Sequence, residues 1–191
     1  KPLMIYGARQ VGKTYLINEF GNMFKEENGE RVPLTIADVD KENGTLTIVF
    51  MAVGYSTKKL AELNIGDEII DLVGPLGQPT HIKKYGTVIC LAGGYGAAPC
   101  YLIAKAFKEA GNKVYMIMGA RTKDLIFWQD KMKDACTELF ITTDDGSMGE
   151  QGFVTGVLER IMGQEKVDYA IMKDGHLYRG KDTNKDQTYF L

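Results

Sequence analysis

The feature that most constrains the fold is an alternation of apolar runs and helical segments between Gly86 and Lys173. The apolar runs are continuous, which is typical of strands buried on both faces of a sheet. The predicted strands are 87–94, 113–120, 137–146 and 167–173, and the predicted helices between them are 98–111, 124–136 and 152–163. This order predicts a doubly wound parallel sheet, the usual frame of a nucleotide-binding domain.

The segment before Gly86 has a different residue pattern, typical of short antiparallel strands. VPLTIADV and GTLTIVFMAV are rich in β-branched residues, and the Asn43-Gly44 pair between them predicts a hairpin. A short helix and a strand at Glu68–Val73 follow, before a glycine-proline turn. The fold class is therefore predicted as α/β, with a partial antiparallel β-barrel followed by the doubly wound parallel-sheet domain.

Composition limits the classes of function. Apolar residues make up 45% of the 191 residues, which suffices for a buried core, and the formal net charge of −2 gives no reason to expect nucleic acid as a partner. No apolar run approaches the ~18–20 residues of a membrane span, so no membrane partner is expected. No secretory signal is visible, although the chain begins at Lys1 rather than Met, which leaves its natural start open.

The cysteines point to free thiols. Cys90, Cys100 and Cys136 are widely spaced and form no C-x-x-C pair, so no metal site is predicted. Such a sparse, odd set is typical of a reducing compartment, which favours the cytoplasm.

A first glycine-rich stretch, GARQVGKT, fits the P-loop pattern G-x-x-x-x-G-K-[ST]. It lies between a predicted strand at Lys1–Tyr6 and a predicted helix at Lys13–Phe20, with a turn from Gly7. This piece resembles the start of a P-loop ATPase, yet the chain after Gly21 does not continue as the parallel sheet that such a loop needs. An ATP and Mg²⁺ site therefore remains an alternative, formed by Gly7, Gly12, Lys13 and Thr14.

A second glycine-rich stretch, LAGGYGAAP, follows a predicted buried strand and opens a predicted helix, as a dinucleotide pyrophosphate loop does. Earlier in the chain, VGYSTKKL places small and hydroxyl residues at a predicted helix start, where backbone N–H groups bind anions. RVPLTI combines an arginine, suited to a phosphate, with a small hydroxyl residue.

These stretches, with VGPLG, MGARTKDLIFWQD and TTDDGSMGEQGFVT, stand in the order found in the ferredoxin-NADP⁺ reductase superfamily. Residues Arg31–Ile171 resemble that superfamily, and most closely its flavin-carrying electron-transfer subunits of the dihydroorotate dehydrogenase and NADH-dependent ferredoxin:NADP⁺ oxidoreductase type. The resemblance implies FAD-binding residues Arg31, Pro33, Leu34, Thr35, Gly54, Ser56 and Thr57. It implies dinucleotide-binding residues Gly93, Gly94, Gly96, Ala98, Pro99, Arg121, Thr143, Asp144 and Asp145.

The resemblance also implies the reaction. Hydride would pass from NADH to FAD, and electrons onward to an iron–sulfur or other redox partner, with no catalytic side-chain acid or base. Asp144 and Asp145 favour NADH over NADPH, because carboxylates accept a ribose 2′-OH and repel a 2′-phosphate. No cysteine follows Cys136, so the iron–sulfur cluster that these subunits bind near their end is not expected here. The resemblance implies an iron–sulfur protein subunit as a partner.

The ends of the chain resemble other families. GHLYRGKDTNKDQTYFL, Gly175–Leu191, is similar to a segment of tRNA-specific 2-thiouridylases, without that family's catalytic residues. We therefore interpret the chain as composite, with a P-loop piece and linker at 1–30, a partial FAD-binding barrel at 31–85, an NAD(P)-binding domain at 86–172 and a polar tail at 173–191. A P-loop ATP-binding module and a folded chimera without activity are the two alternatives to the reductase.

Overall fold

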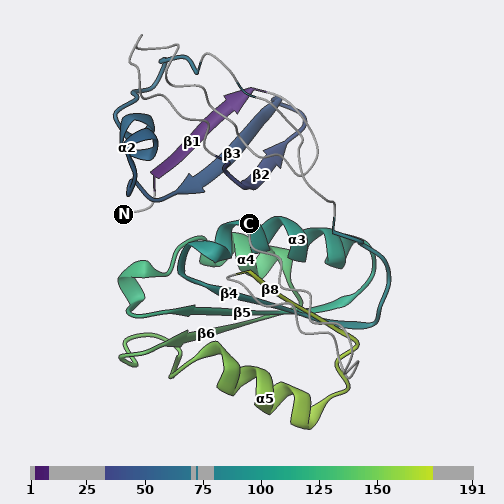
Figure 1. Cartoon of the computed structure of the whole chain (residues 1–191). Helices are drawn as coiled ribbons and strands as arrows, with labels where there is room; N and C mark the ends of the chain where they lie inside the picture. Colours follow the sequence, from purple (N-terminus) through teal and green to yellow (C-terminus); the bar gives the residue numbers. More distant parts are fainter. Residues whose placement is uncertain (1–2, 9–32, 70–71, 73–79, 174–191) are drawn as a thin grey trace. The chain divides into compact units, whose positions relative to one another are not determined.

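The computed structural model describes residues 3–8, 33–69, 72 and 80–173 of the chain. By its internal contacts the chain divides into two compact units, Lys1–Pro79 and Thr80–Leu191, and each is considered by itself (Figure 1). Within the described residues, no helix is long and apolar enough to cross a membrane.

The first unit contains a three-stranded antiparallel sheet in the order β1-β3-β2, followed by helix α2. Its elements are β1 (Leu3–Ala8), β2 (Ile36–Asp40), β3 (Thr45–Phe50) and α2 (Tyr55–Ala61). The predicted hairpin at Asn43-Gly44 forms between β2 and β3. Asp40 Oδ1 accepts the backbone N–H groups of Glu42 and Asn43 at 2.9 and 3.0 Å, and Gly44 has a φ of 65°, which favours glycine.

Strand β1 differs from the prediction for the first glycine-rich stretch. It continues through Gly7 and Ala8, where a turn was expected, because its backbone pairs with β3 from Leu3↔Phe50 to Ala8↔Thr45. The pairing is antiparallel, unlike the parallel sheet that supports a P-loop. The described part of this unit is an open sheet, so the barrel remains a prediction.

The strand predicted at residues 68–73 was wrong for the residues that can be assessed. Glu68, Ile69 and Leu72 lie outside any strand. Ile69 and Leu72 instead pack, partly buried, against a small core formed by Leu46, Ile48, Phe50 and Leu60. Their apolar character therefore reflects burial in a loop rather than pairing in a sheet.

The second unit is the predicted doubly wound sheet. Its five strands are all parallel and lie in the order β7-β6-β5-β4-β8. The strands are β4 (Thr87–Gly93), β5 (Lys113–Ala120), β6 (Glu138–Thr143), β7 (Glu150–Gln151) and β8 (Tyr169–Lys173). The helices are η1 (Gly94–Gly96), α3 (Ala97–Glu109), η2 (Lys123–Leu125), α4 (Gln129–Ala135) and α5 (Val154–Gln164). The short β7 was not predicted.

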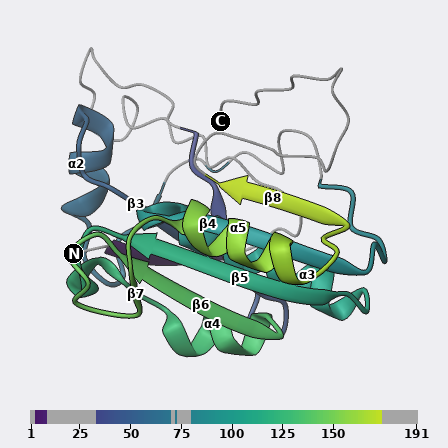
Figure 2. The same ribbon diagram turned by 90° about the horizontal axis from the view of Figure 1, so that it is seen from below.

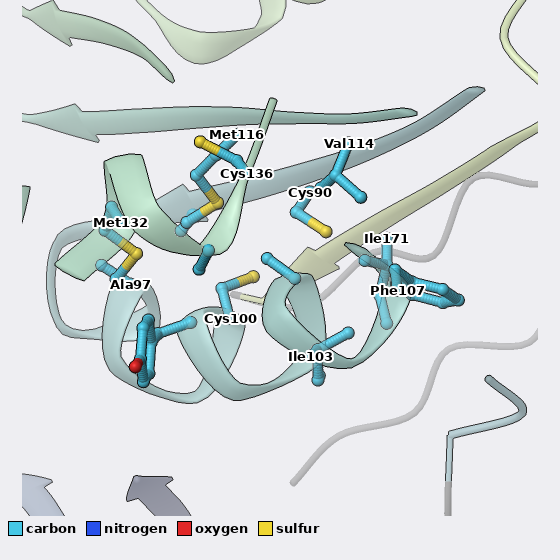
Figure 3. Close-up of a cluster of buried hydrophobic side chains, with 14 of the residues drawn as sticks. Cys90, Ala97, Cys100, Ile103, Phe107, Val114, Met116, Met132, Cys136 and Ile171 are labelled. Carbon is cyan, nitrogen blue, oxygen red and sulfur yellow. The ribbon is translucent and has the colours of Figure 1, made fainter. Parts of the chain in front are cut away.

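Two apolar clusters hold this sheet between its helices. Helices α3 and α4 cover one face and α5 covers the other (Figures 1 and 2). Along β5 the side chains alternate, so that Met116 packs with α3 and α4 while Ile117 packs with α5. All three cysteines lie in the cluster under α3 and α4 (Figure 3), as free and buried thiols.

The helix predicted at residues 124–136 was wrong as a single element. It is divided into η2 and α4, with Ile126, Phe127 and Trp128 between them. The division falls at Trp128, whose φ of 57° and ψ of 29° are left-handed and incompatible with a continuing right-handed helix. Ile126, Phe127 and Trp128 pack, partly buried, against the cluster under α3 and α4, so tertiary packing overrides helical spacing here.

Two polar groups fasten the amino-terminal edge of the sheet. The buried Asn112 amide accepts the N–H groups of Tyr85 and Gly86 at 2.6 and 3.1 Å, and donates to the carbonyls of Lys83 and Phe107 at 2.9 and 2.8 Å.

The second group is Glu165, which follows α5. Its carboxylate accepts from Lys113 Nζ at 2.8 Å and from the Tyr115 hydroxyl at 2.6 Å. These hydrogen bonds lower the pKa of Glu165 and raise the pKa of Lys113 to about 12.

Candidate functional site

The candidate site lies at the carboxyl edge of the parallel sheet, where β4, β5 and β6 end. In the strand register Gly93 pairs with Gly119, and Gly119 pairs with Thr142. The loops that follow these strands therefore leave the sheet next to one another. This edge is where open parallel α/β sheets bind their ligands.

The glycine-rich loop after β4 is a single turn of 3₁₀ helix that leads directly into α3. Gly94 has a φ of 50°, which favours glycine, and a side chain there would meet no other atom within 4 Å. Ala98 and Pro99 lie in the first turn of α3, where proline is tolerated, and no side chain caps this helix start. The backbone N–H groups at the positive end of α3 are therefore available to an anion beside the loop.

The loop after β6 is folded by its own hydrogen bonds. Thr143 Oγ1 donates to the carbonyl of Met148 at 2.8 Å and accepts its N–H at 3.0 Å, so the hydroxyl closes the loop. Gly149, with a φ of 67°, lies so close to Ile141 that a Cβ would come within 2.0 Å of the Ile141 carbonyl oxygen. This backbone approach requires glycine.

The two predicted carboxylates in this loop have different surroundings. Asp145 Oδ1 accepts the N–H of Ser147 at 3.0 Å and its hydroxyl at 2.6 Å, and these bonds lower the pKa of Asp145. The exposed carboxylate of Asp144 has no hydrogen-bond partner among the residues that the structure describes. Its backbone is fixed, because its N–H donates to the Ala120 carbonyl at 3.1 Å. The Asp145 carboxylate thus stabilises the loop by hydrogen bonds, whereas the Asp144 carboxylate is available to accept a hydrogen bond from a ligand.

Arg121 follows β5 at the same edge and is exposed. Its backbone carbonyl accepts the N–H of Asp145 at 3.3 Å, which ties the two loops together. In the described part of the chain its guanidinium has no ion-pair partner. The structure therefore brings together the predicted residues after β4, β5 and β6.

Sequence reasoning missed a depression of about 290 Å³ at the start of α5. Thr142 lines it, and the Thr142 hydroxyl is buried without a hydrogen-bond partner. Phe153, which is 72% exposed, also lines it. Gln151 also lines the depression and donates to the Asp144 carbonyl at 3.4 Å, so the depression adjoins the predicted loop. No feature of the sequence signals this depression, because the exposure of Phe153 is known only from the structure.

The predicted flavin residues lie in the first unit. Pro33 and Thr35 are exposed, and Leu34 packs partly buried against the small core. At the start of α2, Thr57 Oγ1 accepts the N–H of Gly54 at 2.9 Å and donates to its carbonyl at 3.2 Å.

Ser56 is buried, unlike the hydroxyl of a surface ligand-binding residue. Arg31 lies outside the described residues, as do Gly12, Lys13, Thr14 and the tail at 175–191. Among the residues described, no group of three His, Cys, Asp or Glu side chains could hold a metal ion.

Comparisons with known proteins identify the class. No protein-family model matches the chain. The solved structure of the NADH-dependent reduced ferredoxin-NADP oxidoreductase aligns with a TM-score of 0.78 and 36% identity, over 90% of this chain and 62% of that one. The FAD/NAD-binding domain of nitric oxide dioxygenase from Vibrio cholerae aligns with a TM-score of 0.66 at 13% identity, over 90% and 92% of the two chains, which shows the fold alone. The two units therefore have the fold of ferredoxin reductase-like proteins.

The curated relatives are more specific. The dihydroorotate dehydrogenase B (NAD⁺) electron transfer subunit of Fusobacterium nucleatum is 35% identical over 178 residues, covering 83% of this chain and 68% of that protein. Its Thermotoga maritima homolog is 44% identical over 142 residues, covering 74% of this chain and 50% of that protein. The chain belongs to the family of dihydroorotate dehydrogenase B electron-transfer subunits. It spans about half the length of the first curated relatives, at 50% and 59%.

Proposed function

We propose that the chain is a flavin-dependent NADH oxidoreductase module, which moves a hydride from NADH to FAD and passes electrons to a redox partner. The observation that carries this proposal is the carboxyl edge of the parallel sheet, where a glycine-rich loop, Arg121 and the free Asp144 carboxylate lie on adjacent strands. The names of the relatives, electron-transfer subunits and an NADH-dependent oxidoreductase, support the same reaction class.

On the nicotinamide side, the residues present fit a dinucleotide. The turn at Gly93, Gly94 and Gly96 lets the backbone approach the cofactor, and the uncapped start of α3 supplies N–H groups to the pyrophosphate. Arg121, exposed beside this loop, would contribute a positive charge to a phosphate.

Asp144 would accept the 2′-OH of the adenosine ribose and repel a 2′-phosphate, which favours NADH over NADPH. The depression beside it would take the adenine. In that position the exposed Phe153 offers a stacking face to the adenine.

On the flavin side, the fit rests on fewer residues. The exposed Thr35 and Pro33 would lie beside the isoalloxazine ring, and Gly54 with Thr57 would shape the start of α2 for the pyrophosphate. When bound, FAD accepts hydride and releases electrons singly, so the protein needs to align the two cofactors rather than supply an acid or base. The electron acceptor would be an iron–sulfur protein subunit.

The test is a visible absorption spectrum of the full chain after FAD is added, recorded before and after anaerobic NADH. Flavin bands near ~450 nm that bleach with NADH are expected, since the cofactor carries the chemistry. A protein that stays colourless after FAD is added and excess FAD is removed would overturn the proposal.

A further inference from the structure

Trp128 is the one non-glycine residue with a positive φ among those that the structure describes. A bulky residue in the left-handed region is an outlier, and such strain persists only where the surrounding structure enforces it. Here the carbonyl of Trp128 accepts the N–H of Met132 at 2.9 Å and begins α4. The left-handed turn also sends the adjacent side chains of Phe127 and Trp128 to different partners.

Those partners connect the strained turn to the dinucleotide loop. The ring of Phe127 contacts Tyr95, the single large side chain in the glycine-rich turn, at a centroid distance of 6.3 Å. The Phe127 and Trp128 rings are 5.8 Å apart, and the Trp128 ring meets Tyr101 of α3 edge-on at 5.7 Å. Lys131 Nζ lies 4.5 Å from the centroid of the indole ring.

The four aromatic rings form a continuous row of contacts that joins two segments of the fold. Tyr95 and Tyr101 stand at the two ends of the loop-to-α3 junction, and Phe127 and Trp128 bridge them from the segment after β5. A turn with three glycines has a high entropic cost of ordering, and the Tyr95 ring contacts Phe127, which itself packs against the core. The bridge would therefore lower the cost of presenting the loop to a ligand.

We infer that the aromatic bridge of Tyr95, Phe127, Trp128 and Tyr101 preorganises the glycine-rich loop, and that Trp128 is a positioning residue for the nicotinamide dinucleotide. The inference rests on the proposed function for the identity of the ligand. The order of the loop itself does not depend on it.

The first test measures the loop without ligand. Hydrogen exchange of backbone amides at 94–97 is compared in the wild-type chain, Trp128→Phe, Trp128→Asn and the control Phe140→Leu. Asn tolerates the left-handed conformation, so Trp128→Asn removes the ring while keeping the turn. Phe140→Leu breaks a comparable aromatic contact, with Tyr115 at 5.9 Å, on the α5 face of the sheet.

We expect exchange at the loop to rise roughly tenfold in Trp128→Asn, the equilibrium effect of freeing about one backbone residue. Trp128→Phe should retain most of the protection, and Phe140→Leu should leave the loop unchanged. Unchanged exchange in Trp128→Asn, or equal loss in Trp128→Phe and Trp128→Asn, would overturn the inference.

The second test measures NADH binding and the rate of flavin reduction in the FAD-loaded full chain. Trp128→Asn should raise the Kd for NADH roughly tenfold and leave the limiting rate of flavin reduction within about twofold, because the loop is ordered more weakly but binds in the same way. An unchanged Kd alongside looser exchange would overturn the positioning role. If the wild-type chain shows a protected loop and no NADH binding, the proposed function fails and the aromatic bridge stands.

Discussion

Replacement of Asp144 by Asn tests how the chain distinguishes NADH from NADPH. The change removes one charge and keeps the shape of the side chain. Since the Asp144 carboxylate is exposed and has no hydrogen-bond partner in the described part of the structure, the substitution leaves no internal bond unmade. Its backbone N–H remains bonded to Ala120 at 3.1 Å, so the position of the residue should be retained.

The magnitude follows from the exposure of the carboxylate. Repulsion between an exposed carboxylate and a 2′-phosphate a few ångströms away is about 1–2 kcal/mol after solvent screening, or roughly 5- to 30-fold in affinity. Loss of a charged hydrogen bond to the ribose costs about 1 kcal/mol at such a site, or roughly fivefold for NADH. The ratio of kcat/KM for NADPH to that for NADH should therefore rise by roughly 25- to 150-fold.

The assay is steady-state reduction of an artificial acceptor by the FAD-loaded chain with each dinucleotide. Asp145→Asn is the matched control, because that carboxylate is bonded to Ser147 within the loop. Asp145→Asn should lower kcat/KM for NADH and for NADPH by similar factors, since both dinucleotides need the same folded loop. The ratio of the two kcat/KM values should stay within about twofold of the wild-type ratio. The assignment is refuted if Asp144→Asn leaves the ratio unchanged, or if Asp145→Asn shifts it as far.

Four further substitutions test what stabilises the parallel-sheet unit. Gly149→Ala should lower the melting temperature strongly and abolish NADH binding, because its Cβ would lie 2.0 Å from the Ile141 carbonyl oxygen. The control is Gly163→Ala in α5, where a Cβ would meet nothing within 4 Å, and it should stabilise the fold by about 1 kcal/mol. Asn112→Ala should lower the free energy of unfolding by about 3 kcal/mol, measured in urea, because it removes the acceptor of the part-buried Tyr85 and Gly86 N–H groups. Glu165→Gln should destabilise the chain at neutral pH but less in acid, measured by melting between pH 3 and 7. The pKa of this carboxyl is lowered from 4.5, so its stabilisation is present above that value and is lost as the pH falls through the lowered one.

Each of these predictions has an opposing outcome. Equal melting temperatures for the two glycine variants would mean that the loop tolerates a side chain at Gly149. An Asn112→Ala variant as stable as the wild-type chain would show that water replaces the amide. A constant difference between wild type and Glu165→Gln across the pH range would assign the effect to packing rather than to charge.

The sequence predicted the parallel sheet well, for a physical reason. Strands buried on both faces of a sheet must be apolar along their length. The continuous apolar runs that form β4 and β5, with a helical segment between them, therefore indicate parallel strands. The turn between β4 and α3 was also predicted, because glycines at a strand-to-helix junction allow the conformation that such a turn needs. That this loop binds a ligand stays a prediction.

Other features depend on contacts that a single sequence does not display. The spacing of Leu125, Trp128 and Met132 is that of a helix, and only packing against α3 shows why the backbone turns at Trp128. The sequence gives no reason to assign different roles to the adjacent Asp144 and Asp145. The hydrogen bonds to Ser147 show that Asp145 is the carboxylate bonded within the loop.

Other misses have the same origin. Strand β7 is two polar residues long, so it gives no pattern to read. The unpaired Thr142 hydroxyl became visible only once α5 was placed over the sheet.

The buried thiols make the parallel-sheet unit its own reporter of unfolding. Cys90, Cys100 and Cys136 are the three cysteines of the chain, and all lie in the core under α3 and α4 (Figure 3). Burial raises the pKa of Cys90 and raises that of Cys136 to about 11, so neither thiol is nucleophilic at neutral pH while the fold is intact. The rate at which a thiol reagent labels the chain therefore counts the openings of this unit alone, whatever the first unit does.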